Sequence, residues 1–551
     1  MILSPANRPP DTVLLGGAVW VGDAAGSLVS GLAVTDGVVT ALGTEDAVAS
    51  LAGPATERVA LDGRFVVPGF IDAHLHAIKG GMERRQCDLL GAATLAEVTD
   101  TVARYAAEHP AEPWVLGGGW SMDVFPRGIP HARLLDQLVP DRPALLYSRD
   151  HHTAWVNSAA LRLAGIDAET PEPPGGRIDR DQDGTPCGAL QERAMFLVSA
   201  LLPARSREDW LAGLREAQRH LHALGVVGWQ DAKVLHQPAD AEVYAALADR
   251  GELTAHVVGA QWWEPDGGPA QLERLRAVRA EHARPGLRFD SVKLMLDGVC
   301  ETHTAALLTP YVNLPEPDNH GIAYYDQRTL DETVAALDAA GFQAHFHTVG
   351  DAAVRQALDA VAHARRVNGD TGARHHLAHV QVVHPADVGR FRPLRVGVNA
   401  QPLWARHEPQ MTELTIPYLG AERTGWQYPF GSLARSGAVL AIGSDWPVST
   451  PDPLALLQVA VNRLPVPRPD RPGAPPEVFL PDERLTLKAA MNAYQLGSAY
   501  LNHSEHRHGS LELGKQADLV LLDRDPFAAP DQIWRATVLQ TRVAGRVVFA
   551  R

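Results

Sequence analysis

The middle of the chain, between residues 65 and 446, alternates between strand-like and helix-like runs, and this alternation narrows the folds that the chain can adopt. Strands that alternate with helices are typical of βα units, which build parallel sheets. Eight strand-like runs can be counted, at residues 65–76, 225–233, 253–263, 287–298, 342–351, 374–383, 395–404 and 438–446. Eight units of this kind predict an α/β protein with a closed (β/α)8 TIM barrel.

The two ends of the chain have a different character. Residues 13–61 and 517–549 contain short β-type runs interrupted by glycine, a pattern typical of strands joined by turns. Because these β-rich ends flank an unlike middle, we expect residues 1–64 and 507–551 to form one small composite β-sandwich domain. The barrel domain then spans residues 65–506.

The gap between the first two strand candidates is far too long for one crossover helix. It contains stretches rich in proline and glycine, at residues 170–176 and 181–186, which favour loops. We therefore predict that a cap, made of approximately residues 77–200, is inserted above the mouth of the barrel.

Charge and composition exclude several classes of partner. The 551-residue chain has a formal charge of −15, which argues against nucleic acid and anionic membranes because both require a basic face. No apolar run approaches the roughly 18 residues of a membrane-spanning helix, and residues 1–10 lack the cationic start and apolar stretch of a secretory signal. Three scattered cysteines make no disulfide framework. A cytoplasmic protein that acts on a small molecule, as a monomer or a homo-oligomer, fits these features.

Histidine is abundant, with 24 residues, and many of them are clustered. Barrel enzymes carry catalytic groups at the C-terminal ends of their strands, and two-residue spacing on a strand points both imidazoles of the His74-Leu75-His76 motif to one face. Five strand candidates offer suitable side chains: His74 and His76; Lys293; His345 and His347; His375, His376 and His379; and Asp445. Four imidazoles and a carboxylate at one rim make a site suited to zinc and related divalent ions.

Lys293 needs separate treatment, because a protonated lysine cannot bind a metal. Carboxylated by CO2 on its amine, it would become a two-oxygen bridge between two metals. A hydroxide between the metals would then be available near neutral pH, since zinc lowers the pKa of bound water to about 7. Without carboxylation, the site would hold one metal.

Several motifs together indicate a family. They are PGFIDAHLH at residues 68–76, VKL at 292–294 with DG at 297–298, HTVGD at 347–351, RH at 374–375 followed by His379, GSDWP at 443–447, and GSLELGKQADLV at 509–520. With these motifs the chain resembles the amidohydrolase superfamily from about residue 13 to its C-terminus. Its details resemble the YtcJ-like branch, which includes N-substituted formamide deformylases.

The resemblance implies roles for the clustered residues. His74, His76 and Asp445 would bind one metal, His347 and His379 a second, and carboxylated Lys293 would bridge them, most simply as two zinc ions per chain. Asp445 would also take a proton from the attacking hydroxide and pass it to the leaving nitrogen. His379 or a residue of the cap would stabilise the oxyanion.

Neighbouring histidines compete for these roles. His345 shares a face with His347, but His347 lies nearer the C-terminal end of its strand and is favoured, which leaves His345 as a buried, hydrogen-bonded neighbour. By the same argument His379 is favoured over His375, and we expect His375 and His376 to serve in packing.

Substrate contacts are predicted from weaker signals. The segment RDHHTAWVNS at residues 149–158 resembles the substrate-side loop of the branch, so His152 and Asn157 are candidates to line the pocket. Trp120 and Trp404 are candidates for its wall, although such aromatic residues are as often part of a core. Asp297 either contacts substrate or shapes the turn that it forms with Gly298.

The resulting hypothesis is a metal-dependent amidohydrolase that cleaves a carbon–nitrogen amide-type bond by a metal-activated hydroxide. Its substrate would be a small molecule, an N-substituted formamide or a similar amide. The alternative is a hydrolytic deaminase of a heterocyclic or amidine-like substrate on the same scaffold, commonly with one metal. A non-catalytic scaffold is disfavoured, because the ligand set is complete.

Overall fold

The computed structural model describes residues 2–3, 8–235, 240–467 and 477–551. The chain divides into two compact units. Unit 1 comprises Met1–Leu75, Gln218–Ser444 and Pro451–Arg551, and unit 2 comprises His76–Ala217 and Asp445–Thr450. The chain passes between the units after Leu75 and again after Ser444. Both of these peptide bonds lie inside the predicted metal-binding motifs.

Unit 1 contains the predicted barrel as a nearly closed sheet of eight parallel strands. The order around the sheet is β20-β19-β18-β17-β16-β15-β14-β7, and every neighbouring pair is parallel. The strands are β7 (Phe70–Leu75), β14 (Val226–Val234), β15 (His256–Trp262), β16 (Leu287–Met295), β17 (Gln343–Thr348), β18 (His376–His379), β19 (Gly397–Ala400) and β20 (Leu440–Ile442). The predicted α/β class and barrel are therefore confirmed.

Helices follow most of the barrel strands, as βα units require. They are α8 (Asp240–Asp249), α9 (Gln271–His282), α10 (Gln327–Ala339), α11 (Asp351–Asn368), α12 (Pro385–Val388), α13 (Phe391–Leu394), α14 (Ile416–Thr424), α15 (Phe430–Arg435) and α16 (Pro453–Asn462). Helix α10 begins after Asp326, whose side chain accepts a hydrogen bond from the backbone N–H of Thr329 at 2.9 Å. Such caps satisfy N–H groups that the helix itself leaves without a partner.

The first strand candidate, residues 65–76, is two strands rather than one. Strand β6 (Phe65–Pro68) pairs with strands of the terminal sheet described below, and only β7 belongs to the barrel. Gly69 lies between them, and a Cβ atom there would be 2.5 Å from the side chain of Val227. The chain thus changes sheets at a position where only glycine fits, which strand periodicity alone does not reveal.

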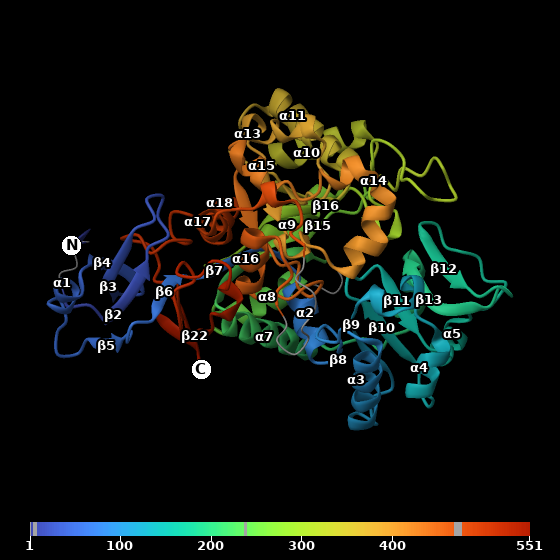
Figure 1. The fold of residues 1–551 in the computed structure, drawn as a ribbon, viewed down its shortest axis with the longest axis horizontal. Coiled ribbons are helices and arrows are strands. Elements are labelled where there is room, and N and C mark those ends of the chain that lie inside the picture. The colour runs from blue at the N-terminus through green and yellow to red at the C-terminus, as the bar shows by residue number, and fades with distance from the viewer. Residues whose placement is uncertain (1, 4–7, 236–239, 468–476) are drawn as a thin grey trace. The chain divides into compact units, whose positions relative to one another are not determined.

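Strands from both ends of the chain form a nine-stranded mixed sheet in unit 1, in the order β1-β4-β3-β2-β6-β21-β22-β23 with β5 beside β2. Figure 1 shows the blue strands β2 to β6 together with red β22. The strands are β1 (Ile2–Leu3), β2 (Thr12–Trp20), β3 (Leu28–Thr35), β4 (Val38–Gly43), β5 (Glu57–Ala60), β6, β21 (Leu519–Leu522), β22 (Val538–Val543) and β23 (Arg546–Ala550). A buried cluster joins side chains from both ends, including Leu14, Leu32 and Leu519. The sandwich form and the predicted domain boundaries stay predictions.

Unit 2 has a sheet of its own, in the order β12-β13-β11-β10-β9-β8. Its strands are β8 (Cys87–Asp88), β9 (Val115–Trp120), β10 (Ala144–Ser148), β11 (Thr153–Val156), β12 (Gly176–Arg180) and β13 (Pro186–Glu192), and its helices include α2 (Ala77–Arg84), α3 (Leu95–Glu108), α4 (Ala132–Leu138) and α5 (Ser158–Ala164). Figure 1 shows β9 to β13 in cyan and green with α4 and α5. In the described part of the chain, no helix combines the length and apolar character that crossing a membrane requires.

Gly443 follows β20, the last strand of the barrel sheet, and substituting it tests how closely the chain packs there against β7, the first strand. A Cβ atom at this position would lie 2.6 Å from the backbone nitrogen and the Cβ of His74 on β7. We expect Gly443→Ala to lower the free energy of unfolding by about 1–3 kcal/mol, because tightly packed positions do not absorb an added methyl group. Denaturant titration measures the change. The control is Gly389→Ala, where no atom lies within 4 Å of the added carbon; equal stability of the two variants would contradict the expectation.

Candidate metal centre

Asp72, on β7, is a buried carboxylate that fixes the backbone on both sides of the candidate centre. Its Oδ1 accepts hydrogen bonds from the backbone N–H groups of His74 and Ser444, both at 3.0 Å, and its Oδ2 accepts one from the hydroxyl of Tyr494 at 3.2 Å. Burial raises the pKa of Asp72 to about 7, against the opposing effect of these donors. Sequence analysis missed this residue, although it lies two positions before His74 and therefore shares its face of the strand.

Three imidazoles lie together at the C-terminal ends of β7, β17 and β18. The ring centroids of His74 and His379 are 4.9 Å apart, and those of His347 and His379 are 4.5 Å apart. Nδ1 of His74 is 2.8 Å from Nε2 of His345, which holds the His74 ring by one nitrogen, so that ligation would use the other. Burial lowers the pKa of His345 well below its usual range.

Asp297 holds His347 in place. Its Oδ1 is 3.1 Å from Nδ1 of His347 and accepts from the backbone N–H of Val349, while its Oδ2 accepts from the N–H groups of Gly350 at 2.7 Å and Ala306 at 3.1 Å. The carboxylate is wholly buried. These contacts suit a carboxylate that orients a histidine, as carboxylates beside metal ligands commonly do, and a contact of Asp297 with substrate stays a prediction.

Lys293 belongs to the same cluster by its place in the barrel. It lies on β16 in register with His345 of β17, and paired positions of neighbouring strands point their side chains to the same face. Its side chain is only 3% exposed. The lysine is thus among the imidazoles rather than on the surface, where most strand lysines lie.

His379 ends β18 in a strained backbone conformation, with φ at +75°. Its backbone N–H donates to Oε1 of Gln401 at 2.8 Å, and its ring stacks on Trp404 at 5.5 Å between centroids and 21° between planes. Trp404, the predicted pocket wall, lies in a short turn (Pro402–Trp404) after β19. Strain of this kind persists where surrounding contacts hold it and is common at functional sites.

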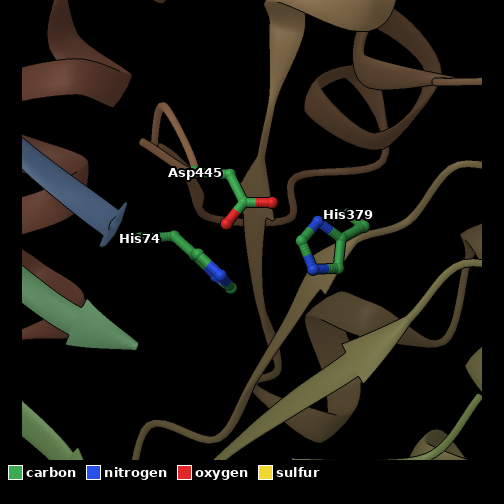
Figure 2. A group of neighbouring side chains, drawn as sticks. All are labelled: His74, His379 and Asp445. Atoms are coloured by element: carbon green, nitrogen blue, oxygen red, sulfur yellow. The ribbon is translucent and has the colours of Figure 1, made fainter. Parts of the chain in front are cut away.

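His76 and Asp445 are the first residues of unit 2 after the two chain crossings. Nε2 of His76 is 3.1 Å from Oδ1 of Asp445, and the backbone N–H of His76 donates to the carbonyl of Trp446 at 2.7 Å. Asp445 also has a positive φ, of +57°. Asp445 follows Ser444, whose backbone N–H donates to Asp72 at 3.0 Å. Figure 2 draws Asp445 with His74 and His379, and ligand atoms of the three lie within 4.8 Å of one another.

The donor set fits a divalent metal. Buried imidazoles that are held by one nitrogen present the other for coordination, and the carboxylate adds a negatively charged oxygen. His375 and His376 do not join this set. His375 accepts from the N–H of Ala344 at 3.0 Å and lies 3.0 Å from Asp338, while Nδ1 of His376 lies 3.3 Å from the amide of Gln343.

Two predicted substrate residues of unit 2 make hydrogen bonds to the backbone of their own unit. Asn157 is the N-cap of α5; its Oδ1 accepts from Ala144 and Ala160, and its Nδ2 donates to the carbonyls of Val139 and Arg142. Trp120 is fully buried, and its indole N–H donates to the carbonyl of Leu146 at 2.9 Å. Substrate contacts of Asn157 and Trp120 stay predictions. His152 pairs with Glu192, with 2.8 Å between Nδ1 and Oε1.

The neighbour of His152 is the residue that sequence analysis overlooked in this segment. His151 has a φ of +62°, and both of its ring nitrogens are buried without a hydrogen-bond partner. Burial and the charge of Lys79 lower the pKa of His151 well below its usual range, and Asp445 opposes this shift. Burying a ring with two unsatisfied polar atoms costs free energy. The feature of the sequence that could have identified this residue is the adjacent histidine pair in Asp150-His151-His152.

Comparisons with known proteins agree with this geometry. A family model described as "Amidohydrolase family" matches residues 57–549. The chain is 29% identical to "Putative amidohydrolase YtcJ" of Bacillus subtilis, over 97% of this chain and 99% of that protein. It is 27% identical to "N-substituted formamide deformylase" of Arthrobacter pascens, over 98% of each. An uncharacterized metal-dependent hydrolase from Pyrococcus furiosus has a similar crystal structure, with a TM-score of 0.72 and 26% identity over 94% of this chain and 99% of that one.

The contact between Asp297 and His347 can be tested by Asp297→Asn. The amide is uncharged and offers two N–H donors where the structure requires acceptors. We expect zinc affinity to fall by about 10–100-fold, the usual effect of losing a carboxylate that orients a metal-binding histidine. Competition with a chelator measures it. Asp249→Asn, at a carboxylate that is 55% exposed, is the control, and unchanged affinity in both variants would contradict the role of Asp297.

Proposed function

Because the chain belongs to the amidohydrolase family, in its YtcJ-like branch, we propose that it hydrolyses a carbon–nitrogen bond of a small amide with two zinc ions. The observation that carries the proposal is the gathering of His74, His347 and His379 at one rim of the barrel. Lys293 lies on the same face of the sheet, and Asp445 follows directly on a residue held by Asp72. In this proposal His74, His76 and Asp445 would hold one ion, His347 and His379 would hold the other, and carboxylated Lys293 would supply a ligand to both.

Zinc at such a site supplies Lewis acidity toward a carbonyl oxygen and lowers the pKa of water to about 7. Asp445 accepts the proton of the attacking water and returns it to the leaving nitrogen, so that the amine departs neutral. His76, 3.1 Å from the carboxylate, orients it for both transfers. His379, held by Gln401 and Trp404, stabilises the charge that develops on the carbonyl oxygen.

The substrate we propose is an N-substituted formamide or a similar small amide with an apolar substituent. The relative from Arthrobacter pascens carries this activity in its name, and the Trp404 ring beside His379 offers an apolar surface for a substituent. The cytoplasmic location and the absence of nucleic-acid and membrane partners stay predictions.

A substrate panel tests the proposed reaction. Zinc-loaded protein is incubated with formamides, acyl amides, ureas, cyclic imides and amino-substituted heterocycles, and the released acid, amine and ammonia are quantified. Release of amine together with formate or another acid from amides supports the proposal. Release of ammonia from the heterocycles alone would indicate a deaminase instead, and no turnover across the panel by metal-loaded protein would favour a scaffold.

Lys293→Ala tests the bridging role. We expect the variant to lose zinc and turnover, because the metals lose their shared ligand, and we expect short carboxylic acids such as acetate and propionate to restore part of both. Elemental analysis and the amide assay measure the two effects. Lys488→Ala, at an exposed lysine of the same unit, should keep both. Full activity of Lys293→Ala without added acid would exclude a carboxylated bridge.

Asp445→Asn tests the proton transfer. An amide has the size of the carboxylate but cannot accept the proton, so we expect kcat to fall by at least about 100-fold while the fold is retained. Circular dichroism verifies the fold, and steady-state kinetics with the best amide of the panel give kcat. Asp531→Asn, at an exposed position, serves as the control. A near-normal kcat in Asp445→Asn would remove the proposed role.

A further inference from the structure

A second group of potential metal ligands lies in unit 1, away from the candidate centre. His256, His508 and Asp518 each offer a ligand atom, and these atoms lie within 4.8 Å of one another. His256 is the first residue of β15, at the N-terminal end of a barrel strand, whereas the candidate centre lies at the C-terminal strand ends. Asp518 immediately precedes β21 of the nine-stranded sheet. The group therefore lies where barrel and terminal sheet meet.

The spacing of the ligand atoms suits a small divalent cation. Oδ2 of Asp518 is 2.8 Å from Nδ1 of His508 and 3.2 Å from Nε2 of His256. Zinc binds such atoms at about 2.0–2.2 Å in tetrahedral geometry, which places neighbouring ligand atoms roughly 3.3 Å apart. Small shifts of these side chains would open the shorter contact to that separation.

One atom of the group lacks a satisfactory partner. Nε2 of His256 is buried and makes no hydrogen bond, although the Asp518 carboxylate is only 3.2 Å away. A nitrogen so close to a carboxylate, but not aligned for a hydrogen bond, is suited to sharing a cation with it. Buried polar atoms usually find a partner, and a metal ion would provide one here.

The carboxylate is also positioned from its other side. Oδ1 of Asp518 accepts a hydrogen bond from the backbone N–H of Ala544 at 2.8 Å, and the backbone carbonyl of Asp518 accepts one from Gly69 at 2.8 Å. Contacts of this kind orient ligands in metal sites. The side chain of His256 is 25% exposed, which leaves a path for an ion.

We propose that His256, His508 and Asp518 bind a structural zinc ion, separate from the candidate centre, that ties barrel strand β15 to the terminal sheet. Water completes the coordination on the exposed side of His256. The N-terminal face of a (β/α)8 barrel contributes to stability rather than to catalysis, so the ion would raise the thermal stability of unit 1. The proposal does not depend on which amide is hydrolysed.

Zinc content and thermal unfolding of the full-length chain test the proposal. The native chain, His256→Gln and His363→Gln are stripped with a chelator, dialysed against micromolar zinc and analysed for zinc per chain. Glutamine keeps an amide that can donate to Asp518 but is a poor zinc ligand, and His363, 32% exposed on α11, is the matched control. We expect His256→Gln to hold one zinc fewer than the other two proteins, and circular dichroism verifies that it folds.

The second measurement uses variants in which two histidines of the candidate centre are replaced, so that the unfolding midpoint reports on the second group. In a His74→Ala/His379→Ala background, we expect added zinc still to raise the unfolding midpoint by about 3 °C or more, and we expect adding His256→Gln or His508→Gln to abolish this rise. Equal zinc content in all three proteins of the first experiment would overturn the proposal. So would a zinc-dependent rise in midpoint that persists in both glutamine variants, and neither result would bear on amide hydrolysis.

Discussion

The hydrogen bonds of Asp72 are the contacts on which the candidate centre depends. One buried carboxylate accepts from the backbone of His74 and from that of Ser444, which is 372 positions away in the sequence. It thereby fixes the backbone of His74 on one side and that of the residue before Asp445 on the other. The backbone next to candidate ligands at both end strands of the barrel sheet, β7 and β20, is thus held by one carboxylate. An uncompensated buried carboxylate would be costly, and Tyr494 supplies the further donor that makes its burial tolerable.

Asp297 likewise accepts hydrogen bonds from backbone N–H groups, on other strands of the barrel. It accepts from three backbone N–H groups after β16 and β17 while it holds the ring of His347. Asp338 holds the ring of His375 and accepts hydrogen bonds from the side chains of Asn368 and Thr371. Buried carboxylates in this barrel thus serve to anchor backbone turns and imidazole rings. For that reason, the position of Asp297 in its motif could not show whether the residue contacts substrate or supports a neighbouring side chain.

The sequence was sufficient to predict the parts of the structure that depend on local pattern. Eight strands follow from the alternation of strand-like and helix-like runs, and the inward face of His74 and Lys293 follows from strand parity. The split at Gly69 could not be predicted, because it depends on the approach of Val227. The roles of Asp72, Asn157 and Trp120 depend on partners that are distant in sequence or belong to the backbone, and no residue pattern encodes these. Ligand roles beyond this geometry stay predictions.

Buried polar atoms without a hydrogen-bond partner occur among the histidines of both units. In unit 1, Nδ1 of His345 and Nε2 of His376 are such atoms, although the other nitrogen of each ring lies close to a polar neighbour. In unit 2 His151 combines a positive φ with two buried ring nitrogens that have no hydrogen-bond partner. Glu83, 3.7 Å from that ring, has its pKa raised to about 7 by burial. Polar groups kept in such a costly state lower their free energy when a partner supplies the missing hydrogen bonds, which makes His151 a candidate for contact with a bound molecule.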